Sequence, residues 1–575
     1  MLLREAEIAG RGICDVRIRA GRIAALAPRL APRPGEAQFA AAGGALLPGL
    51  HDHHLHLLAL AAARQSLRCG PPEIADESAL RRALADAKPR RGWLRGHGYC
   101  ESVAGELDRW RLDGLAPNAP PLRIQHRSGA LWMLNSAALR ALGLDSRAAH
   151  FAGGKRSGGG APLDFAASAR DGGAPLDFAA SARDGGAPLD FAASARDGGA
   201  PLDFAASARD GGAPLDFAAS ARDGGAPLDF AASARDGGAP LDFVEAARGG
   251  ETPLAFVEAA RGDVAPADFA GVERDASGRA TGRLFRADGW LRARLGPAPP
   301  PDLAPVGAAL ARCGITGVTD ATPDNGPEAV ALIAAAQKSG ALPQRVWWMG
   351  GARLPVGGDG APRPLKLLLD DWALPAPEAL ARRVARAHAA GRPVAIHCVT
   401  RAELAVACAA IEQAGALRGD RLEHAAVAPP ELAAWVRRLG LAVVTQPNFV
   451  SERGDDYLRE VAARDLPWLW RCRGWDELGV PLGGGSDAPF GSPDVWAAMA
   501  AATTRRTARG AVLGPGEALR PERALRLFTT PPESPGGAPR RIAPGAPADL
   551  CLLRPPWREA RESLCAAHVR ATWRA

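Results

Sequence analysis

Histidine and aspartate, common protein ligands of divalent metals, stand at the ends of several short apolar runs in this sequence. The first such run continues into HDHHLH, residues 51–56. Residues i and i+2 of a strand point to the same face, so either His54 with His56 or His51 with His53 can direct two imidazoles at one ion. The spacing by itself does not choose between these two pairs. Three later runs each end in one further ligand: His397, His424 and Asp487.

These ligands follow one another at the ends of four of eight apolar runs, although the chain has only 11 histidines. A single histidine of this kind is more often a core or surface residue than a ligand. A histidine pair followed by His, His and Asp, each at the end of a run, is difficult to explain in that way. The pattern therefore predicts a site for a divalent metal.

Lys366, one of only four lysines in the chain, lies inside the apolar run PLKLLLD. An unpaired cation inside an apolar strand is costly, so this lysine needs a partner or a chemical change. Carbamylation by CO2 would turn its amine into an anionic ligand that bridges two metal ions. The alternative is an ordinary buried ion pair with Asp370 or Asp371. We favour the bridging ligand.

The apolar runs are rich in β-forming residues, and helical patterns such as 377–390, 401–414 and 429–439 separate most of them. Eight strands with helical connections predict an α/β fold, specifically a (β/α)8 TIM-like barrel. Catalytic groups of such barrels lie at the C-terminal ends of the strands, which is where the ligands stand. The eight runs are ALLPGLHDHHLH, ITGVTDA, RVWWMG, PLKLLLD, PVAIHCV, RLEHAAV, LAVVTQPNF and PLGGGSDAPF.

The 575 residues exceed what one hydrophobic core usually holds, so we expect further parts around the barrel. Both ends of the chain alternate like short strands, which predicts a small terminal β-sandwich domain. A large insertion after barrel strand 1 is expected to lie over the barrel mouth as a lid. The assignments are residues 1–44 and 541–575 for the β-sandwich, 45–68 and 301–540 for the barrel, and 69–300 for the insertion.

A tandem repeat occupies residues 161–277. The 13-residue unit APLDFAASARDGG occurs in six identical copies over 161–238, and three altered copies follow. Solenoid repeats usually need about 20 residues or more per unit to build a buried face. The main apolar residues of a unit, such as Leu163 and Phe165, are two positions apart and do not share a helical face. We therefore predict that the repeat is irregular or disordered.

The overall composition excludes several classes of protein. Apolar residues make up 47% of the chain and charged residues 23%, which is a globular balance. The net charge of +7 is dilute and no Lys/Arg run builds a basic patch, so we expect no nucleic-acid partner. No run of about 18 apolar residues occurs, so we expect no membrane association. Nine scattered cysteines without a CxxC pair favour reduced thiols and a cytoplasmic location.

The runs PGLHDHHLH, VAIHC, LEHAAV and GGGSDAP resemble the metal-dependent amidohydrolase superfamily. The segments WLRGHGY, LNSAALRALGL, ERDASGRATGRLF and TQPNF are similar to its amidohydrolase family three branch, which contains N-substituted formamide deformylase. The similarity runs in order along nearly the whole chain except the repeat. It implies a metal-dependent hydrolase of carbon–nitrogen bonds.

The resemblance also implies a ligand set. Pro48-Gly49 and Asp52 match the family's approach to its HxH, which selects His54 and His56. The implied cofactor is a divalent metal, in our prediction Zn2+, with one or two ions per chain. A mononuclear site remains workable if the lysine is unmodified. The other implied roles are the bridging, carbamylated Lys366, the second-metal ligands His397 and His424, and the strand-eight Asp487.

In this scheme a metal-activated water attacks a substrate carbonyl. Asp487 takes the proton from the water and passes it to the leaving nitrogen, as general base and then acid. Amides suit this chemistry because a poor amine leaving group needs protonation. The predicted substrate contacts are Gln446 and Asn448 after strand seven, and Trp93, Tyr99 and Asn135 in the insertion.

One departure from the branch concerns Ala130. The branch usually carries a histidine at this place, five residues before the Asn-Ser of LNSAAL, and His126 is a nearby candidate to replace it. The substrate range of the branch is therefore not carried over to this chain.

We predict a cytoplasmic, metal-dependent hydrolase of non-peptide C–N bonds, acting on an amide or N-formyl amide. One alternative is a deaminase or cyclic-amide hydrolase on the same barrel, which release of ammonia as the product would distinguish. Another is a catalytically silent scaffold in which the repeat is an interaction segment. The expected partner is a small-molecule substrate, and the oligomeric state that we consider is a homodimer.

Overall fold

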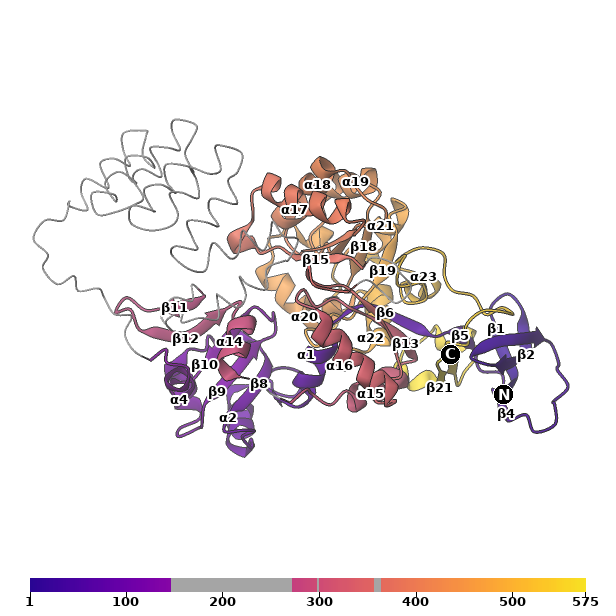
Figure 1. Ribbon diagram of the computed structural model, residues 1–575, viewed down its shortest axis with the longest axis horizontal. Helices are drawn as coiled ribbons and strands as arrows, with labels where there is room; N and C mark the ends of the chain where they lie inside the picture. Colours follow the sequence, from indigo (N-terminus) through magenta and orange to yellow (C-terminus); the bar gives the residue numbers. More distant parts are fainter. Residues whose placement is uncertain (146–270, 297–298, 356–362) are drawn as a thin grey trace, which may run out of the picture. The chain divides into compact units, whose positions relative to one another are not determined.

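The computed structural model describes residues 1–145, 271–296, 299–355 and 363–575 (Figure 1). The chain divides into two compact units, which are described separately below. The first unit comprises Met1–Glu106, Ile124–Ala130 and Leu295–Ala575. The second comprises Leu107–Arg123 and Leu131–Arg294.

Eight short parallel strands form the centre of the first unit, in two sheets of order β14-β13-β6 and β15-β16-β17-β18-β19 (Figure 1). Isolated parallel bridges lie between the edge strands of the two sheets, Gly350 with Leu365 and Leu55 with Ala488. Each strand falls within one of the eight predicted runs. The strands are β6 (Leu50–Leu55), β13 (Ile315–Asp320), β14 (Arg345–Trp348), β15 (Leu365–Leu368), β16 (Val394–Cys398), β17 (Arg421–His424), β18 (Ala442–Thr445) and β19 (Leu482–Gly484).

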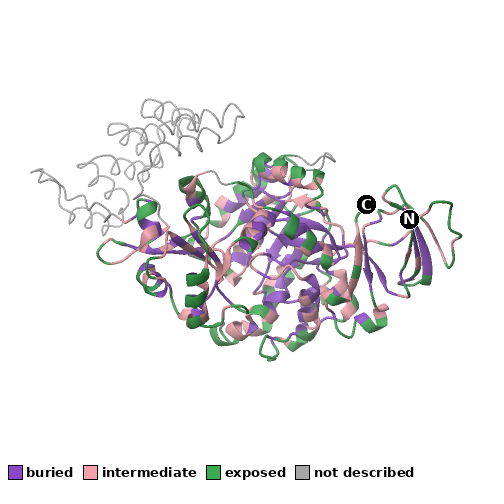
Figure 2. Ribbon diagram, turned by 90° about the horizontal axis from the view of Figure 1, so that it is seen from below, coloured by how far each residue is buried: buried purple, intermediate pink, exposed green. Residues whose placement is uncertain are grey.

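Helices follow most of these strands, and their exposed residues lie on the side away from the buried strands (Figure 2). The helix α18 shows why they start where they do. Thr400 and Glu403 form a capping box that satisfies free N–H groups of its first turn, two residues after β16 ends. The helices are α1 (Leu57–Arg64), α15 (Ala304–Arg312), α16 (Pro327–Lys338), α17 (Pro377–Ala389), α18 (Arg401–Ala414), α19 (Pro430–Arg438), α20 (Asn448–Glu460), α21 (Arg473–Glu477), α22 (Val495–Thr504) and α23 (Pro521–Arg526).

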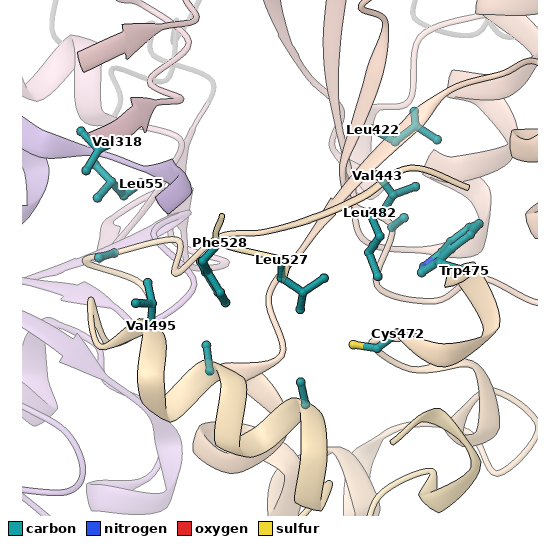
Figure 3. Close-up of a cluster of buried hydrophobic side chains, with 14 of the residues drawn as sticks. Leu55, Val318, Leu422, Val443, Cys472, Trp475, Leu482, Val495, Leu527 and Phe528 are labelled. Carbon is teal, nitrogen blue, oxygen red and sulfur yellow. The ribbon is translucent and has the colours of Figure 1, made fainter. Parts of the chain in front are cut away.

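The main hydrophobic core lies between these strands and helices (Figure 3). Strand residues such as Leu422 and Val443 contribute to it together with the helical Trp475 and Val495. Parallel strands that are buried on both faces are rich in apolar residues, as in β16, whose sequence is VAIHC. The polar side chains at the strand ends therefore rest on a tightly packed support.

The two ends of the chain share a second hydrophobic core, which includes Leu3, Val16, Leu46 and Leu550. Strands near the N-terminus form a sheet of order β3-β2-β1-β4, and β5 pairs with the C-terminal strands in the order β21-β20-β5. These strands are β1 (Leu2–Ile8), β2 (Gly12–Arg19), β3 (Arg22–Ala27), β4 (Gln38–Ala40), β5 (Leu46–Pro48), β20 (Leu550–Leu553) and β21 (Val569–Trp573). The short helix α24 (Trp557–Ala560) lies between the last two strands in the sequence.

Apart from β7, which comes just before it, the remaining strands and α-helices fall within the predicted insertion. The first unit contains β7 (Leu67–Arg68), α2 (Glu77–Asp86), β8 (Leu94–Tyr99) and α3 (Glu101–Ala104), and β7 pairs with β8. β9 (Leu122–His126) has residues in both units. In the second unit, β10 and β11 each pair antiparallel with β12. Its elements are α4 (Arg109–Leu115), β10 (Leu131–Leu134), α5 (Ser136–Ala141), β11 (Val272–Arg274), β12 (Ala280–Phe285) and most of α14 (Asp288–Leu295).

Most of the tandem repeat lies outside the described residues. For that part, the irregular structure expected from the sequence stays a prediction. The exception is the end of the last altered copy. Residues 272–274 form the strand β11, because their backbone pairs with β12, and the prediction of irregular structure is wrong there. No helix of the described residues is long and apolar enough to cross a membrane.

Candidate metal centre

Three of the predicted ligands meet where β6 and β19 end. The Nε2 atoms of His54 and His56 lie 3.5 Å and 3.2 Å from the same carboxylate oxygen, Oδ1 of Asp487. One ligand atom from each of these residues can be chosen so that all three lie within 4.8 Å of one another. The backbone fixes this arrangement, because Asp487 N donates to His54 O (2.7 Å) and His56 N donates to Ala488 O (2.8 Å).

The other histidine pair of the same strand has different partners. His51 Nε2 is bonded to Thr319 Oγ1 (2.9 Å) and His53 Nε2 to Thr530 Oγ1 (3.0 Å). Both imidazoles are buried. The structure thus brings the pair His54 and His56 to Asp487, which the spacing of the sequence had left open.

His397 and His424 extend the cluster of imidazoles. Their ring centroids are 4.5 Å apart, and the His424 ring is 4.8 Å from that of His54. His424 has a φ of 71°, a left-handed conformation that is uncommon for a residue with a side chain and clusters at functional sites. Asp487 has the same unusual conformation, with a φ of 56°.

Hydrogen bonds at Nδ1 direct the imidazoles of this cluster. Gln446 Oε1 lies 2.7 Å from Nδ1 of His424 and can only accept, so Nδ1 carries the proton and Nε2 keeps its lone pair. A carboxylate oxygen of Glu423 bonds Nδ1 of His54 in the same way. Nδ1 of His56 is bonded to Thr322 Oγ1 at 3.0 Å. Such outer hydrogen bonds fix the tautomer and orientation of metal-binding histidines.

Burial keeps the imidazoles of His54, His397 and His424 neutral, which is the form that binds a metal. It lowers the pKa of His54 to about 3 and places that of His397 well below its usual range. The pKa of Asp487 is also lowered, which for a carboxyl group favours the charged form. Burial opposes its ionisation, but the hydrogen bond from His56 and the nearby imidazoles outweigh burial and hold the pKa of Asp487 below its usual range.

Lys366 is buried on β15, and its Nζ has no hydrogen-bond partner among the described residues. Burial lowers its pKa to about 8, although the carboxylates of Glu423 and Asp487 oppose the shift. The charge of Lys366 in turn lowers the pKa of His54 and His397, so the amine lies close enough to these imidazoles to interact with them. The alternative ion pair with Asp370 or Asp371 is not formed.

Glu423 is a residue of this site that the sequence analysis missed. Its carboxylate is fully buried and is shared between His54 and the guanidinium of Arg421, whose Nε lies 2.5 Å away. Arg421 also donates to the carbonyl of His53 at 3.1 Å. A charged Arg-x-Glu pair inside the apolar run that ends in His424 was the available signal, since buried charges need a partner.

The predicted substrate contacts have the following partners. Gln446 and Asn448 are fully buried beside the cluster, and Asn448 Nδ2 donates to Ser486 O at 3.1 Å. Tyr99 donates its hydroxyl to Gly105 O at 2.5 Å, and the backbone of Trp93 pairs with Arg90. In the second unit, the Asn135 side chain accepts from Ala138 N and caps α5. A role in substrate binding is a prediction for all five residues.

Comparison with known proteins identifies the family. The amidohydrolase family matches residues 39–184 and 254–575, which is most of the chain. The chain belongs to the amidohydrolase family. The family resemblance that the sequence motifs predicted is confirmed.

Individual relatives agree with this assignment. Over 199 residues the chain is 28% identical to the amidohydrolase YtcJ of Bacillus subtilis strain 168; the match spans 31% of this chain and 35% of that protein, about a third of the relative's length. Two solved structures are described as uncharacterized metal-dependent hydrolases. That from Pyrococcus horikoshii OT3 has a TM-score of 0.57 and 15% identity over 96% of this chain and 97% of its own. The structure from Pyrococcus furiosus has a TM-score of 0.54 and 14% identity, over 96% of this chain and 98% of its own. The fold of this amidohydrolase is thus a TIM-barrel-like α/β fold.

Proposed function

We propose that this amidohydrolase is a metal-dependent enzyme that cleaves non-peptide C–N bonds, most simply in an amide or N-formyl amide. The observation that carries the proposal is the position of Asp487 Oδ1 within 3.5 Å of Nε2 of both His54 and His56. This arrangement offers one anionic and two neutral donors, with further imidazoles beside them.

The residues present fit a divalent metal of the zinc type. Zinc takes imidazole nitrogen and carboxylate oxygen as ligands, and both kinds of donor are available here. The buried Nζ of Lys366, which has no bond within the described chain, also fits, because carbamylation would give this position an anionic oxygen. We propose one or two Zn2+ ions per chain, held by His54, His56, Lys366, His397, His424 and Asp487.

In this mechanism, bound metal supplies Lewis acidity and makes water acidic enough to ionise near neutral pH. Asp487 Oδ1 takes a proton from the attacking water and transfers it to the departing nitrogen. Asp487 is ionised before the reaction begins, because the surrounding groups hold the pKa of its carboxyl below its usual range. Gln446 and Glu423 hold two imidazoles in one tautomer, so the donors do not need to reorganise during turnover.

We also propose the domain boundaries and location expected from the sequence. The bridges between the edge strands support closure of the two sheets into a barrel formed by residues 45–68 and 301–540. The core shared by both chain ends supports a terminal β-sandwich formed by 1–44 and 541–575. Residues 69–300 then form the insertion. The protein acts in the cytoplasm on a small molecule, without nucleic acid or membrane partners, and the homodimer is its proposed assembly.

The test is the metal content by mass spectrometry of protein purified without chelator, measured beside His54→Ala and the control His51→Gln. The control alters a buried histidine of the same strand that is bonded to a hydroxyl. We expect one or two ions per chain in the wild type and the control, and fewer in His54→Ala. Absence of metal after reconstitution with zinc and bicarbonate would contradict the proposal.

The reaction itself is tested with a panel of N-formyl amides. We expect formate and an amine as the products. Release of ammonia from an amino-heterocycle, with no cleavage of amides, would instead identify a deaminase on the same site.

A further inference from the structure

Phe490 lies beside the catalytic carboxylate in the segment that follows β19. Its N–H donates to Asp487 O at 2.8 Å, and its ring meets the His56 ring edge to face with centroids 5.4 Å apart. The Phe490 side chain is half-buried, whereas Asp487 and His54 are buried. An apolar ring with solvent access therefore stands directly beside the reacting groups.

The Phe490 ring also packs against Gly129. A Cβ atom at residue 129 would lie only 2.4 Å and 2.7 Å from Cε1 and Cζ of Phe490. Gly129 also has a φ of 78°, which side chains disfavour. Only glycine allows the chain to come this close, so the ring contacts both Gly129 and the His56 ring.

Polar contacts hold both segments in place. Arg453 donates through one Nη2 atom to Phe490 O (2.5 Å) and to Arg127 O (3.1 Å), which links the segment after β19 to that around residue 129. Arg127 donates to Asp456 Oδ2 at 2.5 Å, and its N–H donates to Tyr99 O at 2.8 Å. The position of the Phe490 ring is thus determined before any substrate binds.

We infer that Phe490 is a specificity-determining residue that favours substrates with a flat apolar group on the amide. This inference rests on the proposed function of the same site. A preorganised ring binds a flat apolar group at low entropic cost, and aromatic pairs gain further from edge-to-face or offset stacking. Phe490 contacts the substrate outside the reacting bond, so its contribution is to substrate binding rather than to the chemical step.

The test compares N-phenylformamide with N-hexylformamide, which have the same number of carbon atoms but differ in shape. In Phe490→Ala we expect KM for the phenyl substrate to rise about tenfold with kcat nearly unchanged, as for loss of uniform binding. The hexyl substrate should change much less. Phe490→Leu, which keeps apolar bulk and loses the ring, should show the same direction, and it carries the test if the alanine variant does not fold.

Two further variants sharpen the result. Gly129→Ala displaces the ring without changing it and should also lower the phenyl-to-hexyl ratio of kcat/KM. Phe285→Ala removes an exposed phenylalanine (40% exposed) of the second unit and should leave the ratio unchanged. An unchanged ratio in Phe490→Ala and Phe490→Leu, or an equal loss for both substrates, would overturn the inference.

Failure of the proposed function is recognised separately, because then the wild type cleaves neither formamide. In that event the same comparison is made by calorimetry, with Kd of the two uncleaved formamides for the zinc-loaded protein. A selective loss of phenyl binding in Phe490→Ala supports the inference, and an equal effect on both ligands overturns it.

Discussion

The buried carboxylate of Glu423 accepts a hydrogen bond from Nδ1 of His54, the ring whose Nε2 faces Asp487. Glu423 lies on β17 and His54 on β6, so this bond joins strands that are not neighbours in either sheet. Glu423 thereby fixes which nitrogen of His54 is free to bind a metal. Arg421 balances its charge from the other side.

We predict that Glu423→Gln lowers the affinity for Zn2+ about 10- to 100-fold, because an uncharged acceptor orients His54 less firmly and makes it a weaker donor. The affinity is measured by competition with a chelator. A matched control is Glu517→Gln, because Glu517 is also buried and paired with an arginine, Arg471, at 2.8 Å. The control Glu517→Gln should keep the zinc affinity of the wild type. An equal loss of zinc affinity in both variants would mean that Glu423 acts only through the stability of the fold.

Removal of the whole side chain has a different consequence. Glu423→Ala leaves the guanidinium of Arg421, which is 1% exposed, without its carboxylate. Breaking a buried pair in this way costs about 3–5 kcal/mol. We expect a matching decrease in the free energy of unfolding by urea titration of the metal-free protein. A change below about 1 kcal/mol would show that water or another group replaces the carboxylate.

Asp487→Asn should abolish proton transfer while keeping a similar shape. We expect kcat to fall about 10²- to 10⁴-fold, the usual contribution of a general acid–base residue. Metal content is measured on the same samples, so that loss of metal is distinguished from loss of the base. Asp494→Asn is the control, since Asp494 caps α22 and asparagine caps helices equally well. Full activity of Asp487→Asn with metal bound would exclude the proposed base.

Carbamylation of Lys366 should increase as the pH rises. The neutral amine reacts with CO2, and burial lowers its pKa to about 8 from 10.5, so the neutral fraction grows as the pH passes through 8. With 13C-labelled bicarbonate we expect a carbamate signal by NMR that strengthens from about pH 7 to pH 9. Lys366→Met should remove the signal, and the exposed Lys338→Met should not. A signal that persists in Lys366→Met would assign the modification elsewhere.

Deletion of residues 161–238, the six identical repeat units, should leave folding and turnover intact. The reason is that identical short units without a shared apolar face contribute little to a core. Thermal melting and the rate of amide cleavage are compared with those of the full chain. Loss of both properties would show that the repeat has a structural role.

Local pattern alone was sufficient to locate the eight parallel strands and the residues at their ends. All eight apolar runs contain a strand, because β-forming residues buried on two faces leave a continuous apolar signature in the sequence. The spacing of His54 and His56 likewise showed that the two imidazoles share a face. Both conclusions depend only on residues that are close in the chain.

The spacing left open which histidine pair binds the metal, and the family resemblance favoured His54 and His56. The tertiary structure places this pair beside Asp487, because β6 aligns with β19, more than 400 residues later in the chain. It also revealed Glu423, whose bond to His54 spans 369 positions. Contacts of this kind follow from packing and strand register, which a residue's own neighbours in sequence do not encode.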